Sequence, residues 1–153
     1  MSYTTAIGHA HLKVRDLDRS IAFYTRFLAL HEVERVADHY AFLTSGAMHH
    51  EIALQQMAPD APAPPAHGTG LYHVAFEVHD RRGFAAAYRA LTEAGVPVAT
   101  VDHGISWAMY FDDPDGNGLE IYWDTRGEPG GRPLWRGDTT PLLEDMILAT
   151  PGA

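Results

Sequence analysis

Two histidines and one glutamate are the residues in this sequence best suited to hold a metal ion. His9 and His73 stand at matching places in two similar stretches, residues 7–16 and 71–80, which lie 64 positions apart. Glu120 lies on a later predicted strand. Two imidazoles and one carboxylate on one side of an octahedral ion leave positions for water, substrate and dioxygen, as in non-haem Fe(II) oxygenases. The three residues therefore predict an open metal site.

A glutamate followed by an isoleucine recurs near the end of each copy of the repeat. Glu51-Ile52 and Glu120-Ile121 are 69 positions apart, so we interpret the two glutamates as equivalent positions. Histidines and a carboxylate that recur in this way are what a metal site shared between two modules would require. The repeat therefore predicts an architecture as well as a site.

Composition limits the metal, the partners and the compartment. The chain has no cysteine, so nitrogen and oxygen must hold any metal. Fe(II) is the expected ion, with Mn(II) or another divalent metal as alternatives. A formal net charge of −9 disfavours nucleic acid and anionic membrane surfaces as partners. No apolar stretch approaches about 18 residues and no signal-peptide pattern begins the chain, so we expect the cytoplasm.

The pattern of apolar residues predicts an α+β fold in which each histidine begins a strand. Residues 7–14 and 71–78 alternate as strands do, with Leu12 and Val14 on the face opposite His9. Helical spacing follows each strand. The expected buried helix positions are Leu17, Ile21, Tyr24 and Leu28, then Phe84, Ala87, Tyr88 and Leu91. Asp16 is the expected N-cap of the first helix, and Gly95 is the expected C-cap of the second.

Proline and glycine divide the chain into four parts. Residues 1–57 are the expected first module, 58–70 a proline-rich linker, 71–125 the second module and 126–153 a C-terminal tail. We expect the tail to pack on the body of the protein or on a partner subunit, because it carries apolar residues that would otherwise be exposed. These residues are Leu134, Trp135 and Ile147.

These motifs resemble the vicinal oxygen chelate superfamily, which includes glyoxalase I, fosfomycin- and bleomycin-resistance proteins and extradiol ring-cleaving dioxygenases. The matching segments are residues 9–17, 23–24, 72–76 and 113–117, together with Glu120. The resemblance covers residues 6–125. It implies two βαβββ modules that form an open, U-shaped, eight-stranded β-barrel around the metal. It also implies a homodimer, in which modules can be exchanged between subunits.

Three further matches resemble the extradiol dioxygenases that act on catechols with O2. His50 precedes Glu51 much as the acid–base histidine of that family precedes an acidic or polar residue. Tyr110 lies ten residues before Glu120, the spacing of a tyrosine that contacts substrate. His103 matches a histidine that lines the pocket, although its interval to Tyr110 is about two residues short. The resemblance implies that His50, Tyr110 and His103 are the catalytic residues.

Two other functions remain open at this point. His50 and Glu51 point to opposite faces of a regular strand. If Glu51 enters the cavity, it completes a set of two histidines and two glutamates, as in a glyoxalase I-like lyase or isomerase. A non-enzymatic small-molecule (antibiotic) binding protein is the third alternative, and that class typically lacks the metal ligands.

Overall fold

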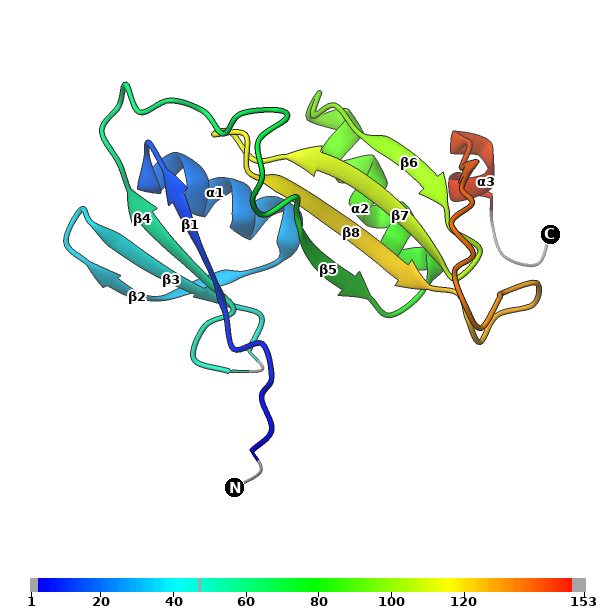
Figure 1. Ribbon diagram of the computed structural model, residues 1–153. Helices are drawn as coiled ribbons and strands as arrows, with labels where there is room; N and C mark the ends of the chain where they lie inside the picture. The colour runs from blue at the N-terminus through cyan, green and yellow to red at the C-terminus, as the bar shows by residue number, and fades with distance from the viewer. Residues whose placement is uncertain (1–2, 47, 150–153) are drawn as a thin grey trace. The chain divides into compact units, whose positions relative to one another are not determined.

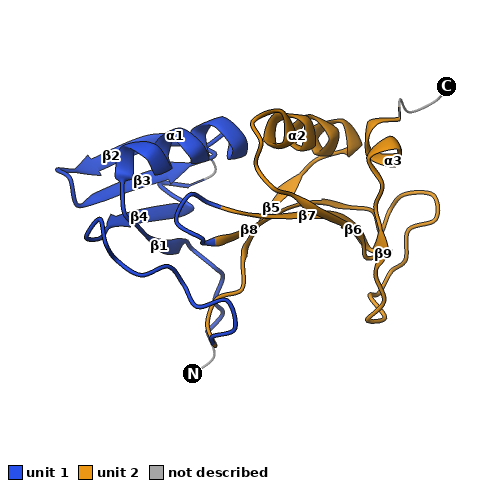
Figure 2. Ribbon diagram, turned by 90° about the horizontal axis from the view of Figure 1, so that it is seen from above, with its two compact units in different colours: residues 1–68, 113–117 blue, residues 69–112, 118–153 orange. Residues whose placement is uncertain are grey.

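The computed structural model describes residues 3–46 and 48–149. These residues form two compact units, shown in different colours in Figure 2. One unit comprises residues 1–68 and 113–117, and the other comprises residues 69–112 and 118–153. In the described ranges we find no helix with the length and apolar character needed to cross a membrane.

The first unit contains one βαβββ module. Its elements are β1 (Ala10–Val14), α1 (Leu17–Leu28), β2 (His31–Val36), β3 (Tyr40–Thr44) and β4 (Ile52–Gln56). The sheet order is β1-β4-β3-β2, with β1 parallel to β4 and the other pairs antiparallel. Helix α1 covers one face of this sheet (Figure 2). The predicted order of the first repeat is therefore confirmed.

The second unit repeats this order and then extends it. Its elements are β5 (Val74–Val78), α2 (Arg81–Glu93), β6 (Ala99–Asp102), β7 (Ser106–Asp112), β8 (Gly118–Asp124), β9 (Thr140–Pro141) and α3 (Glu144–Leu148). The sheet order is β5-β8-β7-β6-β9, so β9 from the tail adds a ninth strand, visible beside β6 in Figure 2. The α+β class and the two βαβββ modules are confirmed (Figure 1). The boundaries of the linker and the tail stay predictions.

His9 and His73, the two histidines predicted as metal ligands, lie just before their strands rather than inside them. The expected strands at residues 7–14 and 71–78 begin three residues later, at Ala10 and Val74. The ladder starts there because the parallel partner β4 begins at Ile52, which pairs with Ala10. Leu12 and Val14 are buried, which confirms the predicted apolar face of β1.

The first helix begins where the sequence predicts, and the second ends with its C-cap at Ala94, one residue before the predicted Gly95. The carboxylate of Asp16 accepts the backbone N–H of Arg19 at 2.9 Å, and Asp80 caps α2 in the same way. A side-chain oxygen at this position satisfies one of the free N–H groups of the first turn. Gly95 follows α2 with a φ of 74°, a left-handed conformation that glycine adopts without strain.

The turn at residues 113–117 belongs to the first unit, although the chain reaches it from β7. Tyr24 donates its hydroxyl hydrogen bond to the buried Asp113 at 3.1 Å, and Arg19 bonds Asp115 at 2.7 Å. Burial, followed by the negative charge of Asp113, raises the pKa of Tyr24. The phenol therefore stays neutral and donates to the carboxylate.

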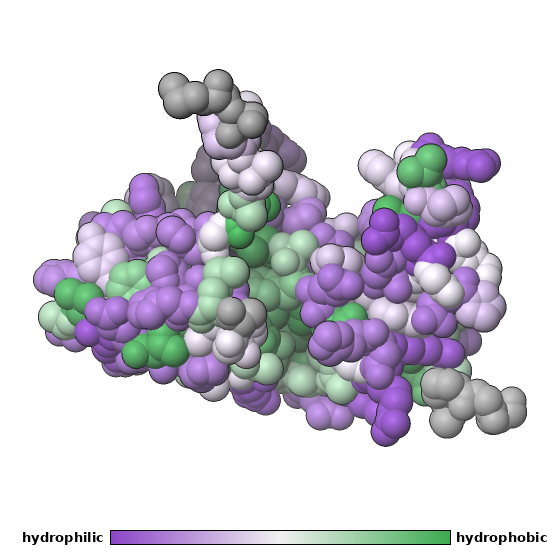
Figure 3. Space-filling view, turned by 90° about the horizontal axis from the view of Figure 1, so that it is seen from below, coloured by the Kyte–Doolittle hydropathy of each residue, from purple (hydrophilic) through white to green (hydrophobic). Residues whose placement is uncertain are grey.

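The tail packs at its end and stays exposed in its middle. Ile147 in α3 and Leu142 are buried, which confirms packing of the tail on the body of the second unit. Leu134 and Trp135 remain 72% and 54% exposed. Figure 3 shows further exposed apolar surface, in green, on the face of the molecule seen from below.

Candidate metal centre

His73 and Glu120 form a close pair in the second unit. The parallel ladder between β5 and β8 aligns Val74 with Leu119 and Ala75 with Glu120, so the residue before β5 lies near Glu120. Nε2 of His73 is 2.9 Å from Oε2 of Glu120. Glu120 is buried and His73 is half-buried. The structure therefore brings together two of the three predicted ligands.

The spacing of this pair fits two ligands of one divalent ion. Metal–nitrogen and metal–oxygen bonds of roughly 2.0–2.2 Å at a right angle put the two donor atoms about 3 Å apart. Nδ1 of His73 is buried and has no hydrogen-bond partner among the residues that the structure describes. Nε2 is thus the ring nitrogen that faces the carboxylate, and the donor set fits a metal.

Tyr110 lies directly across the sheet from Glu120. The antiparallel ladder between β7 and β8 pairs these two residues, which explains their ten-residue spacing. The ring of Tyr110 is 5.4 Å from that of His73. Burial raises the pKa of Tyr110 to about 12, with the charge of Glu120 and a hydrogen bond to it as further causes. Tyr110 is therefore a neutral hydrogen-bond donor near pH 7.

His103 meets Tyr110 despite the short interval between them. Nε2 of His103 is 2.9 Å from the hydroxyl oxygen of Tyr110. The turn between β6 and β7 is tight, because His103 donates its backbone N–H to Ser106 at 2.9 Å and Gly104 has a φ of 74°. A residue of this turn and a residue of β7 can therefore be in contact although they are only seven positions apart in sequence.

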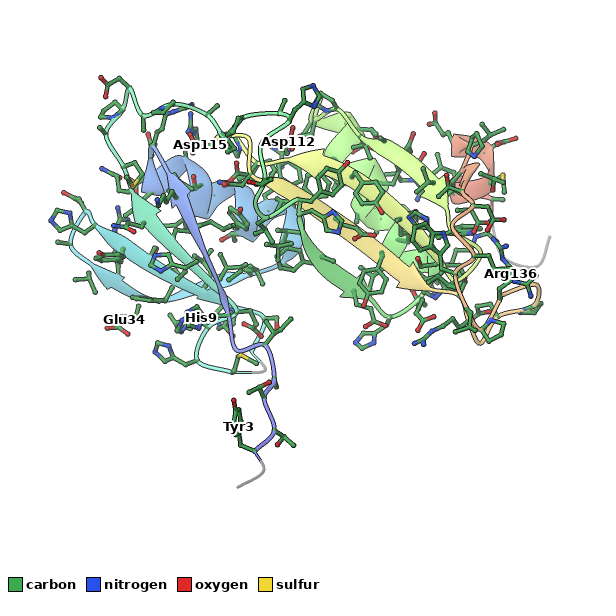
Figure 4. The ribbon with its side chains drawn as sticks, in the orientation of Figure 1. Tyr3, His9, Glu34, Asp112, Asp115 and Arg136 are labelled. Atoms are coloured by element: carbon green, nitrogen blue, oxygen red, sulfur yellow. The ribbon has the colours of Figure 1, made fainter. Side chains whose placement is uncertain are left out.

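His9 lies in a cluster of aromatic rings in the first unit, just before β1 (Figure 4). Its ring centroid is 4.6 Å from that of His50, which packs 4.9 Å from the ring of Phe42. Nδ1 of His50 is 2.9 Å from Nδ1 of His49. Burial, then the positive charges of His9 and His49, lower the pKa of His50. A neutral imidazole is therefore favoured beside His9.

Glu51 is held in the turn before β4. Its two carboxylate oxygens accept the hydroxyl of Ser45 at 2.7 Å and the backbone N–H of Ser45 at 3.1 Å. Burial opposes the charged form, but hydrogen bonds from Ser45 and Thr44 keep the pKa of Glu51 below its usual value. Of the two adjacent residues, His50 contacts His9 and Glu51 binds Ser45.

The strand register overturns the equivalence of Glu51 and Glu120. At the repeat offset of 64, Ala75 corresponds to His11. Ala75 pairs with Glu120, whereas His11 pairs with Ala53. Ala53 therefore occupies the position of Glu120 in the first module. The match at an offset of 69 was wrong because the two modules differ in length between the helix and the last strand.

The predicted three-ligand set is divided between the two units. His9 belongs to the first unit, and His73 and Glu120 belong to the second. Within the part of the chain that the structure describes, no group of three or more His, Asp or Glu side chains is arranged to hold a metal. The three-ligand set therefore stays a prediction.

Two neighbours of these residues were missed by the sequence analysis. His49, which contacts His50, could have been found from the two consecutive histidines. Trp135 lies 5.7 Å, ring to ring, from His103. That contact joins residues far apart in the chain, and no local pattern indicates it.

A family model gives the class of protein to which this chain belongs. The model of the Glyoxalase/Bleomycin resistance protein/Dioxygenase superfamily matches residues 6–121. The chain therefore belongs to this superfamily, as the motifs predicted. Its fold is also that of a solved glyoxylase/bleomycin resistance protein/dioxygenase domain from Frankia sp. EAN1pec. The TM-score is 0.68 at 26% identity, over 80% of this chain and 99% of that chain.

Two curated relatives are dioxygenases by name. Catechol-2,3-dioxygenase of Bacillus subtilis (strain 168) is 37% identical over 120 residues, which cover 78% of this chain. The aligned part is 42% of that relative, so the chain spans less than half of its length. Biphenyl-2,3-diol 1,2-dioxygenase 3 of Rhodococcus globerulus is 31% identical over 134 residues, covering 84% of this chain and 68% of the relative.

Proposed function

We propose that this chain is an Fe(II)-dependent extradiol dioxygenase that cleaves a catechol-type aromatic diol with O2. The observation that carries this proposal is the arrangement at residues 50 and 51. His50 packs against His9, while the Glu51 carboxylate is bound by Ser45. The first module thus offers an acid–base imidazole beside the proposed ligand rather than a second carboxylate. The names of the two dioxygenase relatives support the same reaction.

We assign His9, His73 and Glu120 as the metal ligands. A bound Fe(II) would lower the pKa of the diol hydroxyls and bring the diol and dioxygen to one centre. The protein supplies one negative charge and two neutral nitrogens for this role. The 2.9 Å spacing between His73 and Glu120 supports the assignment for two of the three ligands.

His50 is the proposed acid–base residue. Its Nδ1 lies against His49, which leaves Nε2 to exchange a proton with the substrate. Its lowered pKa keeps the ring neutral near pH 7, so it can accept a proton from the diol and return it later. Phe42 packs on the ring and limits its movement.

Tyr110 is the proposed hydrogen-bond donor to a substrate oxygen. Its raised pKa keeps the hydroxyl protonated, and its contact with His103 fixes the direction of that hydroxyl. A donor that is already oriented stabilises negative charge developing on oxygen, because little reorganisation is needed during the reaction. His103, which contacts the hydroxyl of Tyr110, is the third proposed catalytic residue.

A glyoxalase I-like reaction would need a second carboxylate ligand. The first module has Ala53 at the position of Glu120, and Ser45 binds both oxygens of Glu51. These contacts favour the dioxygenase over the isomerase. A binding protein that holds no metal would not need His73 and Glu120 as a close pair, so this pair favours a metal-dependent enzyme over such a binding protein.

The proposal is tested with metal-free protein loaded anaerobically with Fe(II) and then mixed with catechol in air-saturated buffer. We expect one oxygen consumed per catechol and a yellow ring-cleaved product. The proposal would be overturned by two results obtained together on protein that holds a full equivalent of Fe(II). One is no oxygen consumption with catechol or a substituted catechol, and the other is isomerisation of the hemithioacetal of methylglyoxal and glutathione.

We also propose that the protein is a homodimer. Two positions related by the repeat, Ile7 and Leu71, are 92% and 71% exposed, and Tyr72 beside the latter is 84% exposed. Large apolar side chains at matching places in both units are typical of a surface that another protein covers. Light scattering should give twice the mass of one chain. The mass of a single chain at high concentration would contradict this.

A further inference from the structure

The segment after β8 covers the loop that carries His103. We call residues 126–139 the C-terminal arm. At its start the backbone N–H of Thr125 bonds the carbonyl of Ile105 at 2.9 Å. After its end β9 pairs with β6, and Thr100 donates its hydroxyl to the carbonyl of Leu142 at 2.7 Å. Because both ends are attached, the arm is held against the second unit.

Arg132 joins the arm to the backbone of the His103 loop at two points. Its backbone N–H bonds the carbonyl of Gly104 at 2.8 Å, and its Nη2 donates to the carbonyl of His103 at 3.2 Å. Its Nη1 is held by the carboxylate of Asp138 at 2.9 Å. A Cβ at Gly104 would collide with the guanidinium, so the glycine permits this close approach.

Trp135 holds the ring of the same histidine. The indole lies 5.7 Å from the imidazole at an angle of 81°, an edge-to-face contact. Its Nε1 donates to the carbonyl of Asp138 at 2.9 Å, which fixes its orientation although the ring is 54% exposed. The imidazole of His103 therefore contacts Tyr110 through Nε2 and Trp135 through the ring. Its Nδ1 is buried without a partner among the described residues.

We propose that Arg132 and Trp135 are positioning residues, which hold His103 so that its Nε2 stays in contact with the hydroxyl of Tyr110. Arg132 restrains the backbone of the turn, and Trp135 restrains the rotation of the ring. Without them, a histidine beside a flexible glycine would sample other rotamers, and the tyrosine hydroxyl would lose its fixed direction. The effect on turnover rests on the proposed function, whereas the effect on His103 does not.

The first test follows the histidine rings of the metal-free protein by ¹⁵N NMR, with His103 assigned from a His103→Gln variant. Trp135→Ala and Arg132→Ala should move the Nε2 signal of His103 toward the value of an exposed, tautomer-averaged imidazole. The signals of His79, which lies in the same unit, should stay unchanged, which shows that the fold is retained. Trp135→Phe keeps an aromatic ring and should restore most of the wild-type signal.

Matched controls come from the same arm. Leu134→Ala removes an apolar side chain that is more exposed than Trp135. Arg136→Ala removes an exposed arginine of the same arm, which is labelled in Figure 4. Both controls should give the wild-type His103 signal. If they shift it as much as Trp135→Ala and Arg132→Ala do, the specific contacts are not responsible and the inference is overturned.

The second test measures turnover of the Fe(II)-loaded protein with catechol. Trp135→Ala and Arg132→Ala should lower kcat by about 10- to 100-fold, the scale for a misplaced catalytic group, with full Fe(II) content and little change in KM. If wild type cleaves catechol but these variants keep its kcat and its His103 signal, the inference is wrong and the proposed function stands. If wild type does not consume oxygen, the proposed function fails and the NMR result alone decides the inference.

Discussion

His9 and His73 occupy the same place in the two modules, but their neighbours differ. His73 is half-buried beside the carboxylate of Glu120, with the polar Tyr110 ring across the sheet. His9 is exposed and lies against the ring of His50. The second module thus holds two of the proposed ligands, and the first holds the third proposed ligand beside the proposed acid–base residue.

The strand registers show how far this divergence extends. In the first module, Ala53 occupies the position that Glu120 has in the second. Its partner across the ladder, Phe42, occupies the position of Tyr110. In the first module Phe42 packs against His50, whereas in the second both Tyr110 and Glu120 contact His73. The two modules therefore present different side chains at these two equivalent positions.

The largest effect should come from removing a ligand of the second module. We expect His73→Ala to lose bound Fe(II), because two remaining ligands hold a divalent ion weakly. Elemental analysis after anaerobic loading measures this. Glu51→Ala is the matched control and should keep a full equivalent, because the Glu51 carboxylate binds Ser45. Metal lost from Glu51→Ala, and kept in His73→Ala, would reverse the roles of the two modules.

The next effect separates metal binding from proton transfer. His50→Asn should keep Fe(II) but lower kcat by about 10²–10⁴, the range for losing a general acid–base group. His49→Asn is the control, because His49 contacts His50 on the Nδ1 side and should change the rate less. Oxygen uptake with catechol and metal analysis are made on the same samples. Unchanged turnover in His50→Asn would remove this histidine from the mechanism.

A smaller effect should follow from making the second module resemble the first at one position. Tyr110→Phe places in β7 the residue type found at the equivalent Phe42. We expect full metal content and a kcat lower by roughly 10- to 100-fold. This loss of rate is smaller than that for removing an oxyanion-hole donor, because His103 remains nearby. Phe42→Leu, the control in the first module, should change kcat less. A wild-type rate in Tyr110→Phe would contradict the donor role.

The smallest effect concerns stability and a pair of tyrosines related by the repeat. Tyr24 is fully buried and bonds Asp113, whereas Tyr88 at the matching position is partly exposed. Tyr24→Phe should lower the free energy of unfolding by about 1 kcal/mol, the net value of one hydrogen bond. Tyr88→Phe should change it by less than about 0.5 kcal/mol. Urea titration at neutral pH compares the two variants.

The same pair has an expected pH dependence. The pKa of Tyr24 is raised in the folded state, above the unfolded value of about 10. Its contribution to stability is therefore complete below pH 10 and is lost as the pH rises further, because only the unfolded state releases the proton. The free energy of unfolding of Tyr24→Phe should fall less steeply above pH 10 than that of wild type. Equal slopes would show that Tyr24 does not titrate on unfolding.

Local rules were enough for the elements and for the class of protein. Asp16 and Asp80 cap helices because a side-chain oxygen meets the free N–H groups of a first turn, wherever that turn lies in the fold. The repeat around His9 and His73 predicted a strand followed by a helix in each copy, since alternation and helical spacing are properties of the backbone. The full βαβββ order was implied by the family resemblance. The ten-residue spacing of Tyr110 and Glu120 was visible in the sequence, and the structure places the two residues opposite each other because a single hairpin joins them.

Contacts between distant segments were decided by the tertiary structure. The sequence left His50 and Glu51 as alternatives, and only the structure shows that Glu51 binds Ser45 while His50 packs against His9 and Phe42. The equivalence of Ala53 and Glu120 depends on strand register, which loop lengths and core packing set together. The contact of Trp135 with His103 depends on where β9 attaches to the sheet. Periodicity describes the neighbours of a residue within its own element, whereas these contacts join elements.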